Sequence, residues 1–300
     1  MSAELSVILV TDSLDAVATA LARYRAATDP ARVELVIAAV GPDPRLTEAT
    51  LAAAGFPNAR VVEGGDGTLR SAEWQAFQAT TAPLVVFGQA HAFPRPGFGT
   101  AILAAWSAGR WAVVGPAIAN ANPETLVSRV AMWLSFGRWA GDPPRGAWPD
   151  VPGHNSAYDR AALAALGDHL VDYLEAGWQL QARLVARGHR CFLEPAAGMD
   201  IVNPSRLAPF VAHFFDLGRL VAAQRCQRWS FGRRMAYALG SPLIPFVRLR
   251  RIVTDSLRRG TNAPWIGLPL LALGLAASAA GEATAFLFGP GAPARFVRKA

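Results

Sequence analysis

Three hydrogen-bonding side chains follow one another in the segment His154-Asn155-Ser156, directly after Pro152 and Gly153. An imidazole, an amide and a hydroxyl can together bind a polar ligand or move a proton. Proline and glycine favour a turn, so we expect these side chains to share one loop. The segment would equally suit a helix start, with its asparagine or serine capping a helix over Asp159–Leu166.

Other polar stretches follow predicted strands. Thr11-Asp12-Ser13 ends the apolar run Leu5–Val10, Gly64–Gly67 follows the run Ala59–Glu63, and Gln89-Ala90-His91 lies just after Leu84–Phe87. A further strand is expected over Val33–Val40, and helices are expected over Leu14–Ala27, Thr47–Ala54 and Leu69–Ala79. This alternation predicts a mainly parallel sheet covered by helices on both faces. Ligands bind such sheets at the carboxyl ends of the strands, where these polar stretches lie.

The next hundred residues predict a continuation of the same domain. Helical periodicity is expected over Thr100–Ala108 and Glu124–Trp139, and over a long helix Asp168–Arg187 that carries Asp172 and Glu175. Trp111–Val114 is a predicted strand, and Phe192–Pro195 is a predicted late edge strand.

The C-terminal hundred residues are basic and apolar. The chain has a net charge of +7, and ten arginines lie between Arg219 and Arg259 with Asp255 as the only acid. Pro264–Gly281 contains no charged residue, and its 18 residues would form about 27 Å of helix, close to a bilayer core. We expect membrane contact through a spanning or an in-plane helix, with the heavier basic side on the cytoplasmic face. A buried core helix is the alternative. Because the arginines lie among apolar residues and no nucleic-acid motif occurs, nucleic acid is not an expected partner.

Several enzyme classes are disfavoured. No strand is followed by a phosphate-binding G-x-x-x-x-G-K-[ST] or a dinucleotide-binding G-x-G-x-x-G, and no G-x-S-x-G nucleophile elbow occurs. Cys191 and Cys226 lack metal-ligand spacing and suit a reducing compartment. The first residues lack a basic region before an apolar run, so a secretory signal is not expected.

From about Leu5 to Asn203 the chain resembles family 2 glycosyltransferases with the GT-A fold. The resemblance rests on the order and spacing of six segments: Ser6–Thr11, Leu69-Arg70-Ser71-Ala72, Ala82–Phe87, Phe93–Phe98, Gly153–Tyr158, and Leu174-Glu175-Ala176-Gly177 running to Arg187-Gly188. It implies a three-layer α/β/α domain over residues 1–203. Residues 204–300 would form a helical, basic and apolar, membrane-associating region.

The resemblance also implies an activity. An inverting glycosyltransferase would move a sugar from a nucleotide-activated donor to a lipid-linked or surface polysaccharide acceptor, at the cytoplasmic face of the cell membrane. Glu175 would be the general base, with Asp172 as the fallback and His154 and Asn155 on the acceptor side. Donor-binding residues would be Thr11, Asp12, Arg70, Gln89 and His91.

The chain departs from the family at two positions. Gln89-Ala90-His91 stands where the family has an Asp-x-Asp that holds a divalent metal, so His91 is the expected ligand if Mn²⁺ or Mg²⁺ is bound. Ala38-Ala39-Val40 stands where the family often has an aspartate pair that reads the base. A second hypothesis follows: a catalytically silent GT-A-like protein that binds a nucleotide or acts as a scaffold at the membrane. Tyr158, Trp139 and Trp148 could form a sugar-stacking wall or pack in the core.

Overall fold

The computed structural model describes residues 3–174, 176–227, 229–259 and 265–289, without the side chains of 255–259 and 265. The chain forms two compact units. Residues up to 119 and 139–201 form the first, called the α/β unit, and residues 120–138 with 202–293 form the second, called the helical unit. The domain boundary expected after residue 203 stays a prediction, and the segment 120–138 groups with the C-terminal helices.

A nine-stranded sheet runs through the α/β unit, and its first four strands are parallel. Its order is β3 (Ala59–Glu63), β2 (Val33–Ala39), β1 (Leu5–Thr11), β4 (Leu84–Phe87), β8 (Ala157–Asp159), β6 (Val113–Asn120), β9 (Cys191–Ile201) and β5 (Ala92–Pro94), with β7 (Gly146–Trp148) paired to β9. Strand β8 is antiparallel to both β4 and β6. The mainly parallel α/β architecture predicted from the sequence is thereby confirmed.

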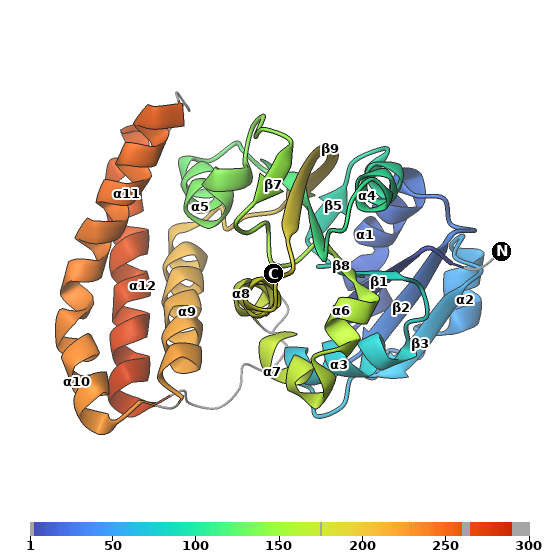
Figure 1. Ribbon diagram of the computed structural model, residues 1–300, viewed down its shortest axis with the longest axis horizontal. Helices are drawn as coiled ribbons and strands as arrows, with labels where there is room; N and C mark the ends of the chain where they lie inside the picture. The colour runs from blue at the N-terminus through green and yellow to red at the C-terminus, as the bar shows by residue number, and fades with distance from the viewer. Residues whose placement is uncertain (1–2, 175, 228, 260–264, 290–300) are drawn as a thin grey trace. The chain divides into compact units, whose positions relative to one another are not determined.

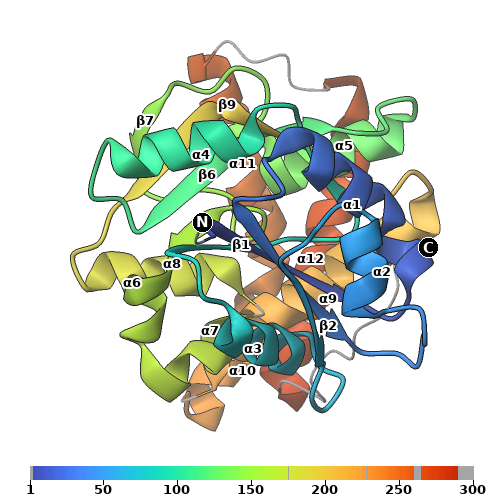
Figure 2. The same ribbon diagram turned by 90° about the vertical axis from the view of Figure 1, so that its right-hand side faces the viewer.

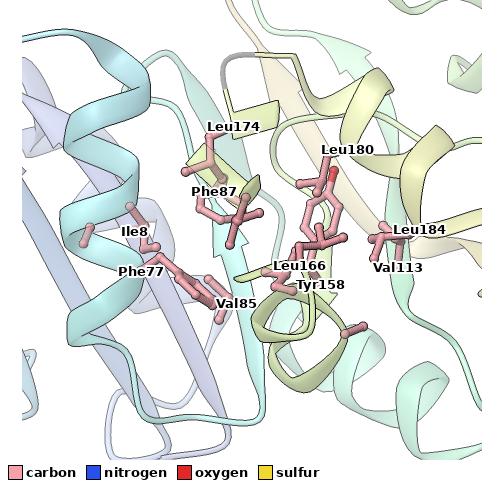
Figure 3. Packing of buried hydrophobic residues seen from close by; sticks show 14 of the residues in the cluster. Ile8, Phe77, Val85, Phe87, Val113, Tyr158, Leu166, Leu174, Leu180 and Leu184 are labelled. Atoms are coloured by element: carbon pink, nitrogen blue, oxygen red, sulfur yellow. The ribbon is translucent and has the colours of Figure 1, made fainter. Parts of the chain in front are cut away.

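Helices cover both faces of the sheet. They are α1 (Leu14–Ala27), α2 (Glu48–Ala53), α3 (Leu69–Ala79), α4 (Phe98–Ser107), α6 (Arg160–Ala164), α7 (Val171–Leu174) and α8 (Gly177–Ala186). Figure 2 shows α1 and α3 on opposite sides of β1 and β2. Ile8, Val85 and Phe87 point to the α3 side, where they join Phe77 and Tyr158 in one buried cluster (Figure 3).

Three local expectations were wrong. The long helix expected over Asp168–Arg187 is divided into a 3₁₀ turn (Gly167–Leu170), α7 and α8. The late strand is eleven residues long and lies inside the sheet rather than at its edge. Asp159, and not Asn155 or Ser156, caps the helix that follows, because its carboxylate accepts a hydrogen bond from Ala162 N. The residues before it form strand β8 instead.

The helical unit contains α5 (Leu126–Phe136), α9 (Leu207–Cys226), α10 (Phe231–Gly240), α11 (Ile244–Arg259) and α12 (Leu268–Phe288), with a 3₁₀ turn at Ser241–Leu243. Helices α9 and α12 lie side by side (Figure 1). A Cβ built on Gly218 would lie 2.0 Å from Ser278 O, and one on Gly281 would lie 2.0 Å from Phe215 O. The two backbones therefore approach so closely that only glycine fits at these positions.

Among the described residues, α12 is the one helix long and apolar enough to cross a membrane. However, 56% of its most apolar window is buried within the protein. Its one carboxylate, Glu282, is 1% exposed and forms an ion pair with Arg248 of α11, with Nη2 2.6 Å from Oε1. Arg248 also donates to Ser278 Oγ at 3.0 Å. These contacts are those of a core helix.

Candidate functional site

The carboxyl ends of β1 to β4 lie at one edge of the sheet, and the first residue after each of β2, β3 and β4 donates a backbone hydrogen bond to the neighbouring strand. Val40 N donates to Thr11 O at 2.9 Å, Gly64 N to Ala39 O at 2.8 Å, and Gly88 N to Ile8 O at 2.9 Å. Strands β1, β2 and β3 end in register at Thr11, Ala39 and Glu63, and β4 ends opposite Ile8, so the polar stretches after β1, β3 and β4 lie along this edge. We call it the strand-end edge.

Gln89 and Asn155, which are 66 residues apart in sequence, bind each other at this edge. The Asn155 Nδ2 donates to Gln89 Oε1 at 3.0 Å, while the Gln89 backbone N donates to Asn155 Oδ1 at 3.1 Å. The Asn155 backbone N also donates to Phe87 O at 2.8 Å. A predicted donor-side residue and a predicted acceptor-side residue therefore form one unit, which we call the amide pair.

Asn155 adopts a left-handed backbone conformation, with a φ of 64°. Asparagine tolerates this conformation better than other residues with a side chain, because its short amide can compensate locally. The amide of Asn155 is almost fully buried, and its hydrogen bonds to Gln89 supply that compensation. The amide pair therefore fixes the path of the loop.

Gln181 of α8 anchors the same loop from the other side and was missed by the sequence reasoning. Its Oε1 accepts from Val151 N at 2.9 Å, and its Nε2 donates to Pro152 O at 3.2 Å and to the Tyr158 hydroxyl at 3.1 Å. Gln181 is 1% exposed. A signal was present, because Gln181 lies on the apolar stripe of its helix beside Leu180 and Leu184.

His154 faces a buried carboxylate that the sequence reasoning also missed. Its Nε2 lies 3.3 Å from Oε1 of Glu73, a residue of α3 that is 2% exposed. Burial raises the pKa of Glu73, and the contact with His154 opposes that rise. In the described part of the chain, neither Glu73 Oε2 nor His154 Nε2 has a well-directed hydrogen bond. Here too the signal was an acid on the apolar stripe of a helix.

Arg70 lies one helical turn before Glu73 and therefore shares a face of α3 with it. Its helix begins at Thr68, whose hydroxyl accepts from Ser71 N at 3.3 Å. Asp66 accepts hydrogen bonds from Thr68, chiefly through the side-chain hydroxyl, and these lower the Asp66 pKa. Helix spacing relates Arg70 to Glu73, a 3.3 Å contact joins Glu73 to His154, and His154 adjoins Asn155 of the amide pair in the chain, which together define a path of polar residues. His91 follows Gln89 by two residues.

The polar side chains in the turn after β1 form hydrogen bonds with other residues of the same turn. Thr11 is fully buried, and its hydroxyl donates to Ser13 O at 2.7 Å. Asp12 is half-buried, and its carboxylate accepts from the Ser13 hydroxyl at 2.9 Å. In the next loop, Asp43 accepts from Leu14 N at 3.0 Å, and hydrogen bonds from Arg45 and Leu14 hold its pKa well below the ordinary value. Thr11 thus shapes the turn, and Asp12 is the side chain with access to the edge.

The two carboxylates proposed for proton transfer are those of Asp172 and Glu175. Asp172 is exposed and forms an ion pair with His169, 3.8 Å away. Glu175 lies outside the described residues. Two residues further along, Gly177 opens α8, and a Cβ built there would lie 2.5 Å from the Cα of Gly153. The start of α8 therefore packs backbone against backbone with the loop that carries His154 and Asn155.

The three aromatic residues that could form a sugar-stacking wall are wholly or partly buried in the core. Tyr158 is fully buried and donates to Gly153 O. Trp139 and Trp148 are half-buried against the core cluster, and their indole N–H groups donate to Asp150 O and Pro144 O.

The donor set at the strand-end edge does not match the usual site for a hard divalent cation, which is rich in carboxylate oxygens. Within the described ranges, no group of three or more His, Cys, Asp or Glu side chains could hold a metal. Gln89 supplies a neutral oxygen that already accepts from Asn155, and His91, which is half-buried, supplies a nitrogen.

A hollow of about 540 Å³ opens at the opposite edge of the sheet, away from these residues. It is lined by Glu4, Arg32 and Pro83, which precede β1, β2 and β4, and by one side of α4. Its position at the amino ends of the strands separates it from the strand-end edge.

No protein-family model and no curated protein sequence matches the chain. Solved structures resemble it, including the following two. A mannosyltransferase from Pyrobaculum calidifontis, in complex with GDP-Man and Mn²⁺, aligns with 96% of this chain and 76% of its own, at 17% identity and a TM-score of 0.51. GalNAc-T7, with UDP, GalNAc and Mn²⁺, aligns with 67% of this chain at 14% identity and a TM-score of 0.51. That match spans only 44% of the GalNAc-T7 chain. The chain therefore has the GT-A-like fold that the sequence resemblance implied.

Proposed function

We propose that the protein is a glycosyltransferase that moves a sugar from a nucleotide-activated donor to a hydroxyl of a glycan acceptor. The observation that carries this proposal is the path of polar side chains at the strand-end edge of a GT-A-like sheet. Similar folds have been solved with nucleotide sugars or their parts, GDP-Man in one case and UDP with GalNAc in the other. Open α/β sheets bind ligands at this edge, which supports placing the donor there.

One side of the site would bind the donor and the other would bind the acceptor. On the donor side, Arg70 would bind the diphosphate, Asp12 would contact the nucleotide, and the segment Gln89–His91 would line the sugar pocket. On the acceptor side, His154 and Asn155 would orient the incoming hydroxyl. In an inverting transfer, that oxygen bonds to the anomeric carbon as the bond to the diphosphate breaks, and Glu175 would accept the released proton.

A divalent metal, Mn²⁺ or Mg²⁺, was expected, and both solved relatives in fold hold Mn²⁺. Because the side chains here are neutral rather than acidic, we assign no step of the reaction to a metal. Donor titrations with and without Mn²⁺ would show whether His91 and the donor's own phosphates suffice to hold one.

Replacing Glu175 tests the proposed base. Glu175→Gln should lower turnover by about 10²-fold or more while donor binding persists, because the amide keeps the shape but cannot accept a proton. Glu48→Gln, on the exposed surface of α2, is the matched control and should leave the rate unchanged. A wild-type rate in Glu175→Gln would remove Glu175 from the mechanism.

The acceptor we propose is lipid-linked or a surface polysaccharide, with the enzyme held at the cytoplasmic face of the cell membrane by its C-terminal region. The arginine-rich segment before α12 and the exposed apolar side chains of the helical unit support membrane association. Such attachment would keep the active site beside an acceptor that cannot diffuse away from the bilayer.

A second candidate function is a catalytically silent nucleotide-binding scaffold at the membrane. The amide pair favours it, because Gln89, which stands at the Asp-x-Asp position of the resembled family, is neutral and is hydrogen-bonded to Asn155. A chain that binds a nucleotide sugar, yet neither transfers nor hydrolyses it with any offered acceptor, would support this reading.

A further inference from the structure

The helical unit exposes large apolar side chains on α10, α11 and the turn between them. Leu239 is 83% exposed, Phe246 is 71% exposed and Phe231 is 70% exposed, and Leu243 and Val247 are also exposed. Figure 1 shows α11 beside α12, with α10 continuing the same run of chain. In a monomeric soluble protein, a cluster of this kind marks a surface that binds a partner or a membrane.

These side chains form one stripe that ends in arginines. Phe246 and Arg250 are four residues apart and share one side of α11, and they follow the exposed Leu239 at the end of α10 and Leu243 in the 3₁₀ turn. Arg251 is exposed next to the end of the stripe. On the opposite side of α11, Arg248 turns inward to Glu282. We call the outward stripe with Val247 and Arg251 the α10–α11 face.

Charge on this part of the chain has one sign. From Phe231 to Thr254 there are five arginines and no acidic residue. Arg234 is used internally, since it donates to the carbonyl oxygens of Phe286 and Leu287 at the end of α12. Arg233, Arg250 and Arg251 are exposed, and Arg233 stacks on Trp229. A complementary partner must therefore offer both an apolar layer and negative charge.

We propose that the α10–α11 face docks in the plane of an anionic lipid bilayer, with Leu239, Leu243 and Phe246 in the acyl boundary and Arg250 and Arg251 among the headgroups. A helix with one apolar side and arginines beside it binds membranes in this way. The inference deepens the membrane association of the proposed function and rests on it. It assigns the attachment to a surface, whereas α12 serves as the core against which α9 and α11 pack.

Vesicle co-sedimentation of the full-length chain tests the proposal. The protein should bind vesicles of phosphatidylcholine with 30% phosphatidylglycerol, and bind pure phosphatidylcholine much less. Arg250→Gln with Arg251→Gln should weaken binding to the anionic vesicles by about 5-fold per arginine. Phe246→Ser should weaken it by more than about tenfold in both low and high salt, because it removes apolar insertion rather than charge.

Matched variants separate this face from general effects of charge and exposure. Arg23→Gln with Arg110→Gln removes the same charge from the exposed surface of the α/β unit, and Val185→Ser removes an exposed apolar side chain there. Both should bind like the wild type. Melting temperatures should be unchanged in all four proteins, since each altered side chain is exposed.

Three results would overturn the proposal. One is equal binding of the Phe246→Ser protein and the wild type. Another is loss of binding in the α/β-unit controls to the same degree. The third is a concentration-dependent dimer that Phe246→Ser dissociates, which would assign the face to a second copy of the chain. Transfer to a soluble acceptor, measured in parallel, distinguishes failure of this inference from failure of the glycosyltransferase assignment.

Discussion

Polar and apolar side chains are placed in opposite ways in the α/β unit, with its strand-end edge, and in the helical unit. In the α/β unit, apolar strands fill the interior and the polar side chains gather where the strands end, around Gln89 and Asn155. In the helical unit an ion pair, Arg248 with Glu282, lies inside, while Leu239 and Phe246 face outward. The most apolar segment of a chain can therefore be largely buried within the protein. Helix α12 is the more apolar, yet 56% of its most apolar window is buried, whereas Phe246 and Val247 of α11 are exposed.

Breaking the internal ion pair should produce the largest effect. Arg248→Met would leave Glu282 buried without its ion-pair partner and with only the charge of Arg225 nearby, at a cost of about 3 kcal/mol in the free energy of unfolding at pH 7. Burial already raises the pKa of Glu282, so the loss should shrink toward pH 5 as the carboxyl takes up a proton. Denaturant unfolding at both pH values measures this.

The double variant Arg248→Met with Glu282→Leu is the control for that prediction. With both charges replaced by apolar groups, stability should return close to the wild-type value. A double variant as unstable as the single one would mean that the arginine acts through packing rather than by compensating a charge.

Breaking the amide pair should cost less. Asn155→Ala removes two hydrogen bonds to Gln89 and places an ordinary residue at a φ of 64°, which together cost about 2–3 kcal/mol of unfolding free energy. Asn155→Gly loses the same hydrogen bonds but adopts this φ freely, so it should cost about 1 kcal/mol less. Equal losses in thermal unfolding of the two variants would show that the backbone conformation contributes nothing.

Glu73 should give a smaller effect that depends on pH. Its folded-state pKa is raised, so the folded chain holds this proton more tightly than the unfolded chain. The resulting stability is fully present below the ordinary pKa of 4.5 and is lost as pH rises through the folded-state value. Glu73→Gln should therefore flatten the decline in unfolding free energy above pH 4.5. If the slope of unfolding free energy against pH is the same in Glu73→Gln as in the wild type, a group other than Glu73 causes the decline.

Asp172 should give the smallest effect. Its ion pair with His169 joins two exposed side chains, and such pairs contribute less than about 1 kcal/mol. Asp172→Asn should change neither stability nor turnover measurably. A large loss of turnover would restore Asp172 as a candidate base in place of Glu175.

The sequence predicted the elements of the α/β unit and the edge at which its polar residues gather, because strand periodicity and the turn residues are local signals. It did not predict Glu73 or Gln181, whose roles depend on contacts with a loop about 80 and 30 residues away. Both occupy apolar helix stripes, and a polar residue in such a stripe is a usable signal. Hydropathy drew attention to Pro264–Gly281, whereas the exposure of Phe246 depends on how α11 packs on α12, which hydropathy does not record.

Calorimetric titration of the full-length protein with UDP- and GDP-activated sugars, each with and without Mn²⁺, tests whether the strand-end edge is a donor site. At least one nucleotide sugar should bind, and Arg70→Gln should weaken its binding by about tenfold or more through loss of a charged hydrogen-bond donor. If the folded wild type binds none of them in either condition, the strand-end edge is not a donor site and the proposed glycosyltransferase function is wrong.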